Sequence, residues 1–196
     1  MFIRSLRSNY PQLCKGREII VIDCNQFHDP EKDKGDVKRH RGTHWKIQSG
    51  VMDDRRFEEI MDPLRRFNSI PEGRRKLIVC VCRSGRHRSE AVRSAVHTTL
   101  CYDYYDVQPD SGGISTIQLQ AGDRWNHICT QGRCSECDYD AWMHKRVPNN
   151  TPIQWISSMA TWCDRRRQRI RDLIGLPPGT ITARRSPVPD LSLIHI

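Results

Sequence analysis

The chain has 196 residues, of which 37% are hydrophobic and 28% charged, and it carries a net charge of +9. This size suffices for one domain with a full core. No apolar run approaches the roughly 20 residues that cross a bilayer, so the sequence predicts no membrane partner. The basic charge favours anionic partners, with RNA and phosphorylated metabolites first. The odd cysteine count of nine and the absence of a secretion signal predict a cytoplasmic protein.

The first predicted strand is Arg17–Cys24, which follows a segment, 1–16, that shows no clear period and is expected to be disordered or an incomplete start. The strand is a continuous apolar run, typical of a parallel strand buried on both faces. Polar residues follow it directly, among them Asp23 and Asn25. The carboxyl ends of such strands are where α/β sheets bind ligands.

The next segment, 31–50, is long and charged. A loop of this length inside a domain is usually functional or disordered. Two interpretations stay open. In the first, residues 41–45 fold over a ligand as a lid, with His44 contacting a phosphate or a base and Trp45 stacking. In the second, the segment is a solvated, mobile loop.

An amphipathic helix is predicted at Asp53–Asn68, with Asp53 as its cap and a bend at Pro63. Its apolar stripe has helical spacing and is expected to face the core. The stripe consists of Phe57, Ile60, Met61, Leu64 and Phe67.

A buried strand at Lys76–Val81 leads through a short loop into a helix that reaches Leu100. A loop that leaves a strand and opens a helix directs backbone N–H groups and the positive helix end at one point. The simplest interpretation is a phosphate cradle, and the alternative is a turn with solvated charges. The candidate ligand-binding residues are Arg83, Ser84, Gly85, Arg86, His87, Arg88 and Ser89, with Asn25 and His44 from the earlier segments.

Cys82 and Arg88 are separated by five residues, and Ser89 follows. A loop of this length can wrap one tetrahedral anion, with the sulfur below it and the guanidinium gripping two of its oxygens. In an enzyme, Cys82 would attack phosphorus and Arg88 would stabilise the equatorial oxygens. Asp23 or Asp29 would then be the general acid.

A Cys-rich insertion at 125–144 follows a strand predicted at Ile114–Gln120. Its cysteines have a spacing that can converge on one tetrahedral, structural zinc ion, and free thiols on a loop are the alternative. The candidate zinc ligands are Cys129, Cys134, Cys137 and His144, with His127 as the other choice for the fourth position. No other cofactor is predicted.

The best-delimited helix is Thr151–Gly175, which has a capping box at its start and a glycine at its end. Its arginines crowd the surface opposite the apolar stripe. They are predicted to neutralise RNA phosphates, and a solvated basic face is the alternative. The RNA-binding candidates are Arg165, Arg166, Arg167 and Arg169.

The remainder, 176–196, is rich in proline and basic residues and is expected to be a disordered tail. Residues 191–196 look like an in-frame translation of a sequencing-library transposon end. We expect these six residues to be an artefact.

The alternation of strands and helices predicts a three-layer α/β domain over 17–175 with a mostly parallel sheet. Its loop resembles the C-terminal domain of the RNase adapter protein RapZ, whose loop reads Cys-Thr-Gly-Gly-x-His-Arg-Ser, with Gly85, His87, Arg88 and Ser89 in register. Asp23 and Asp29-Pro30 match a second motif of that family, and Asn25 stands where the family has arginine. The spacing from Cys82 to Arg88 also resembles the Cys-x5-Arg loop of cysteine-dependent phosphatases.

These resemblances imply different functions. The RapZ-like one implies a module that binds a phosphorylated metabolite or RNA without chemistry of its own, and no GxxxxGK[ST] motif accompanies it. The phosphatase-like one implies an enzyme in which Cys82, Arg88 and Asp23 are catalytic. A redox or zinc-regulated sensor is the third interpretation. The sequence sets no oligomeric state.

Overall fold

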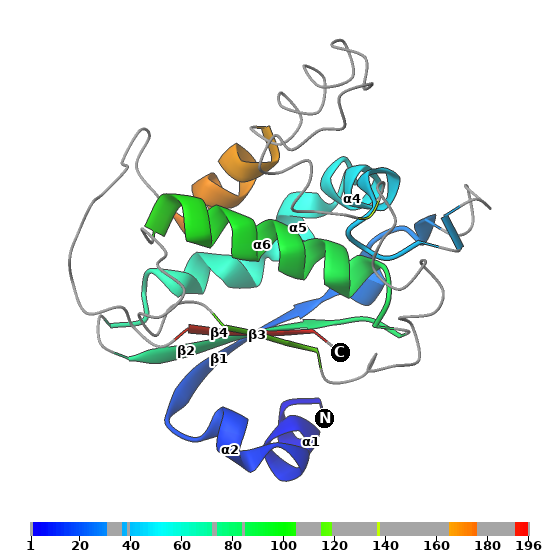
Figure 1. Ribbon diagram of the computed structural model, residues 1–196. Helices are drawn as coiled ribbons and strands as arrows, with labels where there is room; N and C mark the ends of the chain where they lie inside the picture. Colours follow the sequence, from blue (N-terminus) through cyan, green and yellow to red (C-terminus); the bar gives the residue numbers. More distant parts are fainter. Residues whose placement is uncertain are drawn as a thin grey trace.

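The computed structural model describes the chain in several stretches. These are residues 2–30, 37–38, 40–71, 74–83, 85–104, 115–118, 137, 165–175 and 191–195. They form a mixed α/β structure in which helices cover a parallel sheet (Figure 1). None of the helices in these stretches combines the length and the apolar character needed to cross a membrane.

The sheet contains β1 (Arg17–Asp23), β2 (Arg75–Val81), β3 (Ser115–Gln118) and β4 (Leu191–His195), in the spatial order β1-β2-β4-β3. Every pairing is parallel. The register aligns Arg17 with Arg75 and Asp23 with Val81, so β1 and β2 begin and end together. The strands predicted at 17–24, 76–81 and 114–120 are therefore confirmed.

Alternate side chains of β2 enter two different cores. Leu77 and Val79 pack in a cluster on one face, whereas Ile78 and Cys80 belong to the larger cluster on the other face. A strand buried on both sides needs apolar residues at every position, which explains the continuous apolar run in its sequence.

The larger core lies beneath α4 (Trp45–Met52), α5 (Phe57–Met61) and α6 (Arg88–Tyr104), which cover the upper face in Figure 1. Residues 165–174 are also helical and lie on this side, where Ile170, Leu173 and Ile174 are buried. The predicted end of this helix is confirmed, since Gly175 has a φ of +75°. Its predicted beginning, at Thr151, lies outside the described residues.

The helix predicted at 53–68 forms as two pieces, α5 and the 3₁₀ helix η3 (Asp62–Phe67). The break comes at Pro63, which has no N–H for an α-helical hydrogen bond. The predicted cap at Asp53 is wrong, because Asp53 ends α4 and the N-cap of α5 is Arg56; in the turn before α5 the Asp54 carboxylate accepts a hydrogen bond from the Arg56 N–H at 2.8 Å. All five residues of the predicted stripe are buried.

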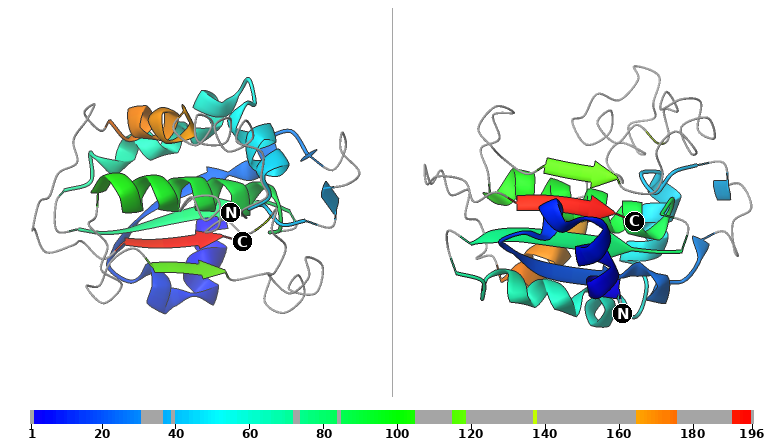
Figure 2. Two further views of the ribbon diagram at one scale, coloured as in Figure 1. Left: turned by 45° about the horizontal axis from the view of Figure 1, so that its top comes forward. Right: turned by 90° about the horizontal axis from the view of Figure 1, so that it is seen from below.

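The prediction of a disordered start is wrong for residues 2–14, which form α1 (Phe2–Asn9) and α2 (Pro11–Cys14). Figure 2 shows both helices lying against the lower face of the sheet. Leu6 holds them there, since it is buried against Ile19, Leu77 and Val79. The burial of this side chain supplies the tertiary contact that two short helices require.

The prediction of a disordered tail is wrong for residues 191–195, because β4 pairs with β2 on one side and β3 on the other (Figure 2). The alternation of LSLIH suits a strand. Pairing does not bear on where these residues come from, so their interpretation as an artefact stays a prediction. Residues 176–190 lie outside the described stretches.

Candidate functional site

Two turns meet at the carboxyl ends of β1 and β2. The shared register places the turn after Asp23 beside the turn after Val81. The first turn is the 3₁₀ helix η1 (Cys24–Gln26), and the second is the predicted loop 82–89, which opens α6. The structure therefore brings together the residues that the sequence singled out at the ends of both strands.

Asn25 joins the two turns through its side chain and its backbone. Its Oδ1 accepts a hydrogen bond from the Arg83 N–H at 2.8 Å, and its Nδ2 donates to Asp23 Oδ1 at 2.9 Å. Its carbonyl oxygen accepts from Nη1 of Arg88 at 3.0 Å. We predicted Asn25 as a ligand-binding residue, whereas the structure shows it positioning the loop.

Arg88 lies at the first position of α6 and points back over the first turn. Its Nη1 donates to the carbonyl oxygens of Asn25 and Phe27, each at 3.0 Å. Its Nε–H and Nη2–H groups meet no acceptor among the described residues. One nitrogen thus fixes the guanidinium, and two others remain to bind an anion in the two-pronged manner typical of arginine.

Cys82 and Ser89 form the floor of the loop. The Sγ of Cys82 lies 3.1 Å from the Oγ of Ser89, and both side chains are buried. This contact closes the loop across its base, so that its two ends are held together beneath the start of α6.

Backbone donors surround the space above this floor. Gly85 has a φ of +62°, a left-handed conformation that glycine adopts without steric cost. Within the described stretches, the N–H groups of Gly85, Arg88 and Ser89 have no acceptor. Successive amides around a left-handed residue at a helix start form a concave nest that attracts anions. Ser84 lies outside the described residues.

The segment 40–44 packs directly against this loop. The Gly42 N–H donates to the carbonyl oxygen of Arg86 at 2.8 Å, and Nε2 of His87 lies 2.9 Å from the His40 carbonyl oxygen. Residues 42–44 are buried, so the interpretation as a solvated loop is wrong for them. Closing and opening as a lid stays a prediction.

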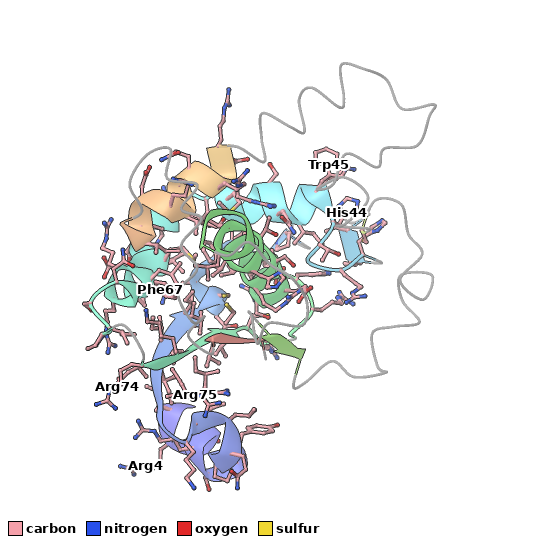
Figure 3. The ribbon with its side chains drawn as sticks, turned by 60° about the vertical axis from the view of Figure 1, so that its left-hand side comes forward. Arg4, His44, Trp45, Phe67, Arg74 and Arg75 are labelled. Carbon is pink, nitrogen blue, oxygen red and sulfur yellow. The ribbon has the colours of Figure 1, made fainter. Side chains whose placement is uncertain are left out.

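His44 caps α4 rather than facing an anion. Its Nδ1 accepts a hydrogen bond from the Lys46 N–H at 3.2 Å, and its ring lies 4.2 Å from that of His40 and 6.1 Å from that of Trp45, between ring centres. Figure 3 shows His44 and Trp45 at the start of α4. The contact of His44 with a ligand stays a prediction, and the structure adds a capping role through its Nδ1.

A buried thiol group lies under the two turns. Burial raises the pKa of the Cys24 thiol well above its ordinary value, and a hydrogen bond with Cys80 together with the nearby thiol of Cys82 raises this pKa further. Cys24 is fully buried. Its thiol therefore stays protonated and packs as an apolar group.

The arginines predicted to bind RNA are largely used inside the fold. Arg166 is 1% exposed, and its Nη1 donates to Oε1 of Gln48 on α4. Arg169 donates from Nη1 to the Met52 carbonyl oxygen and stacks on the Phe57 ring at 4.2 Å. Arg165 is exposed and Arg167 is half-buried. Arg166 and Arg169 thus fasten helix 165–174 to α4 and α5, which corrects their predicted role.

The zinc prediction concerns mostly residues outside the described stretches. Cys129, Cys134 and His144 lie there, as does His127. Cys137 is described, and its Sγ lies 3.4 Å from Nδ1 of His40. Among the described residues there is no group of three or more potential metal ligands.

Sequence reasoning missed two features of the site. Gly42 leaves no room for a side chain, because a Cβ there would lie 2.2 Å from the carbonyl oxygen of His87. Thr43 carries a buried Oγ1 that has no hydrogen-bond partner within the described residues. A glycine and a threonine in a charged loop give no sequence signal of this kind, because both features arise only when the loop packs.

Comparisons with family models, with curated proteins and with solved structures find no match to this chain. The chemistry of the site is therefore argued from its own residues.

Proposed function

We propose that the chain is a phosphate-binding module that holds a phosphorylated small molecule in loop 82–89, on a three-layer α/β domain similar to the RapZ C-terminal domain. The observation that carries this proposal is a set of donors around the start of α6 for which the described stretches of the chain supply no acceptor. They are the backbone N–H groups of Gly85, Arg88 and Ser89 and the Nε–H and Nη2–H groups of Arg88. A phosphate supplies the oxygens that such donors need.

The surroundings favour a negative charge at this point. The acidic residue in the first turn of α6, Glu90, is paired with Arg93 at 2.7 Å, which offsets its charge. The unsatisfied hydroxyl of Thr43 belongs to the segment that packs on the loop, and it could donate to a ligand oxygen. Arg166 and Arg169 are used internally, so two of the four arginines predicted to contact RNA are committed to the fold. A small phosphorylated molecule therefore suits the loop better.

The proposal places the module in the cytoplasm, where phosphorylated metabolites are abundant. The described cysteines of α2 and of the sheet and its turns fit a reducing compartment, since Cys14, Cys24, Cys80 and Cys82 form no disulfide.

Calorimetric titration with inorganic phosphate and with an aryl phosphate tests the module. Replacing Arg88 by Gln should weaken phosphate binding roughly 10- to 100-fold, which is the effect of losing charged hydrogen bonds. Arg88→Lys keeps the positive charge but lacks the planar guanidinium, so its affinity for phosphate should lie between those of Arg88→Gln and the parent chain. Arg55→Gln, at an exposed arginine before α5, is the matched control and should bind like the parent chain. Equal weakening in Arg55→Gln, or no phosphate binding by the parent chain, overturns the proposal.

A cysteine-dependent phosphatase is the second candidate, favoured by the 3.1 Å contact between Cys82 and Ser89. A hydroxyl so placed would stabilise a thiolate when it departs from phosphorus. The first candidate for a general acid, Asp23, is instead used in the turn, where its Oδ1 accepts from the backbone and side-chain amides of Asn25. The test is the hydrolysis of an aryl phosphate. A phosphatase would hydrolyse it, and Cys82→Ser would abolish this turnover while still binding phosphate.

A further inference from the structure

A basic surface extends from the lower face of the sheet, where α1 and α2 lie, to the amino ends of β1 and β2 (Figure 1). It is built by α1, α2 and the amino ends of β1 and β2, and we call it the amino-end basic surface. It consists of Arg4, Arg7, Lys15, Arg17, Arg74 and Arg75. Two acidic residues fall within the same stretches of sequence, Glu18 and Glu72. The charge of this surface is therefore strongly positive.

Several observations place these basic residues next to one another. Arg4 and Arg7 are three positions apart on α1, so they share one side of the helix. Arg7 and Arg17 both act on the thiol of Cys14, whose pKa burial raises and these two arginines lower. Arg17 is aligned with Arg75 in the sheet. Figure 3 shows Arg4 beside α1 at the bottom of the molecule and Arg74 and Arg75 above it, where β2 begins.

Leu6 is the apolar residue of α1 that is buried against the sheet, whereas Ile3 on the same helix is 42% exposed. Leu6 is 2% exposed and packs on the sheet, so α1 cannot lay its apolar face into a lipid surface without leaving the sheet. What the helix offers to solvent is Arg4 and Arg7 together with the apolar side chain of Ile3. This arrangement fits a polyanion that runs along the surface better than a membrane.

An exposed aromatic side chain follows directly after α1 in the chain. Tyr10, in the turn between α1 and α2, is 36% exposed. An aromatic side chain within a basic surface is the combination that binds single-stranded nucleic acids, in which cations follow the phosphates and the ring stacks on a base.

We propose that the amino-end basic surface binds single-stranded nucleic acid, with the arginines along the phosphates and Tyr10 stacked on a base. This binding is separate from the phosphate-binding function of loop 82–89 and does not depend on it.

The test measures binding of a labelled oligouridylate of about 12 nucleotides, a length within the site sizes of such surfaces. The variant Arg4→Gln/Arg7→Gln/Arg74→Gln should bind at least about tenfold more weakly. The slope of log affinity against log salt concentration should become less steep by about 2, because three phosphate contacts are lost. Tyr10→Ser should bind roughly tenfold more weakly with an unchanged salt dependence. Thermal unfolding of each variant checks that these exposed substitutions leave the fold intact.

The matched control is Arg55→Gln/Arg65→Gln/Arg66→Gln, which removes the same charge from exposed arginines on the other side of the sheet. It should keep the affinity of the parent chain within about twofold, as should Arg88→Gln in the phosphate loop. Equal weakening in the control triple would show general charge attraction and overturn the proposal. A second result would also overturn it: the parent chain binds anionic vesicles but not the oligonucleotide, and Arg4→Gln/Arg7→Gln/Arg74→Gln abolishes that vesicle binding. An undiminished affinity of Tyr10→Ser together with equal binding of a duplex would overturn the single-stranded specificity.

Discussion

At the scale of single residues, Gly42 determines how closely segment 40–44 approaches loop 82–89. A Cβ at this position would lie 2.2 Å from the His87 carbonyl oxygen and 2.7 Å from the Ala91 nitrogen, both of them backbone atoms. Backbone at the start of a packed helix cannot move aside as a flexible side chain can. The approach of the two segments is therefore possible only for glycine.

We expect Gly42→Ala to lower the free energy of unfolding by about 3 kcal/mol, at the upper end of the usual cost of overpacking. Chemical denaturation of the two proteins measures the difference. Gly50→Ala is the matched control, because a Cβ at Gly50 meets no atom within 4 Å and the residue lies within α4. It should raise stability by about 0.5–1 kcal/mol through helix propensity. A Gly42→Ala protein as stable as the parent would contradict the packing described for this segment.

The buried thiol of Cys24 makes stability depend on pH in the alkaline range. Its pKa in the folded protein is raised by burial and by Cys80, whereas an unfolded cysteine ionises near its ordinary value of about 8.5. The unfolded chain therefore loses its proton first as pH rises. The contribution of Cys24 to stability is complete below about pH 8.5 and declines as pH rises toward the raised folded value.

Urea unfolding at about pH 7.5 and pH 9.5 checks this, with Cys24→Ala compared with the parent chain. The variant should be less stable at the lower pH, because a buried side chain has been shortened. Its further loss of stability at the higher pH should be smaller than that of the parent. If both proteins lose the same stability over this range, the ionisation of Cys24 is not coupled to folding.

At the scale of elements, helix 165–174 is held to α4 by a contact between buried polar groups. Arg166 donates to Gln48, whose side chain is fully buried. Removing the acceptor alone leaves a guanidinium in the core without this hydrogen bond, and such a loss costs more than a neutral hydrogen bond does.

We predict that Gln48→Leu destabilises the protein by about 2 kcal/mol. The double variant Gln48→Leu/Arg166→Met should recover most of this loss, because apolar groups then face each other. A double-mutant cycle, with thermal unfolding as the measurement, isolates the coupling. Ser49→Ala, at a half-buried neighbour on the same helix, should cost much less. Additive effects of the two core substitutions would mean that Arg166 and Gln48 do not interact.

The local features of the fold could be predicted from the sequence, whereas the long-range contacts could not. Strands 17–23 and 75–81 contain uninterrupted apolar runs at 19–22 and 77–81, and the loop between Cys82 and Ser89 carries its glycine and three arginines within six positions. By contrast, the bond from Arg83 to Asn25 spans 58 positions and that from Arg166 to Gln48 spans 118. No periodicity in a single sequence reports such pairs. An exposed basic helix face and a buried arginine also produce the same sequence pattern. This is why Arg166 was wrongly predicted to bind RNA.

At the scale of the whole molecule, the two proposed binding regions occupy different parts of the sheet, because α1 and α2 lie on its lower face and loop 82–89 lies at its carboxyl edge. Loop 82–89 follows the carboxyl ends of β1 and β2, and the amino-end basic surface surrounds their first residues, Arg17 and Arg75. Seven residues of extended chain separate the ends by about 20 Å. At that distance exposed charges are screened at physiological salt, so we expect the two regions to bind their ligands independently.

Thermal unfolding with added ligand tests this independence. A ligand that binds only the folded state stabilises it by about 2.7 kcal/mol at a hundred times its dissociation constant. Phosphate should therefore raise the unfolding temperature of the parent chain and of Arg4→Gln/Arg7→Gln/Arg74→Gln by the same amount, and it should have little effect on Arg88→Gln. The oligouridylate should produce the reverse pattern, stabilising Arg88→Gln but not the triple variant. The variants remove charges from different parts of the molecule. If one variant lost the stabilisation by both phosphate and the oligouridylate, the two ligands would share a single anion site, and the expectation of independent binding would be wrong.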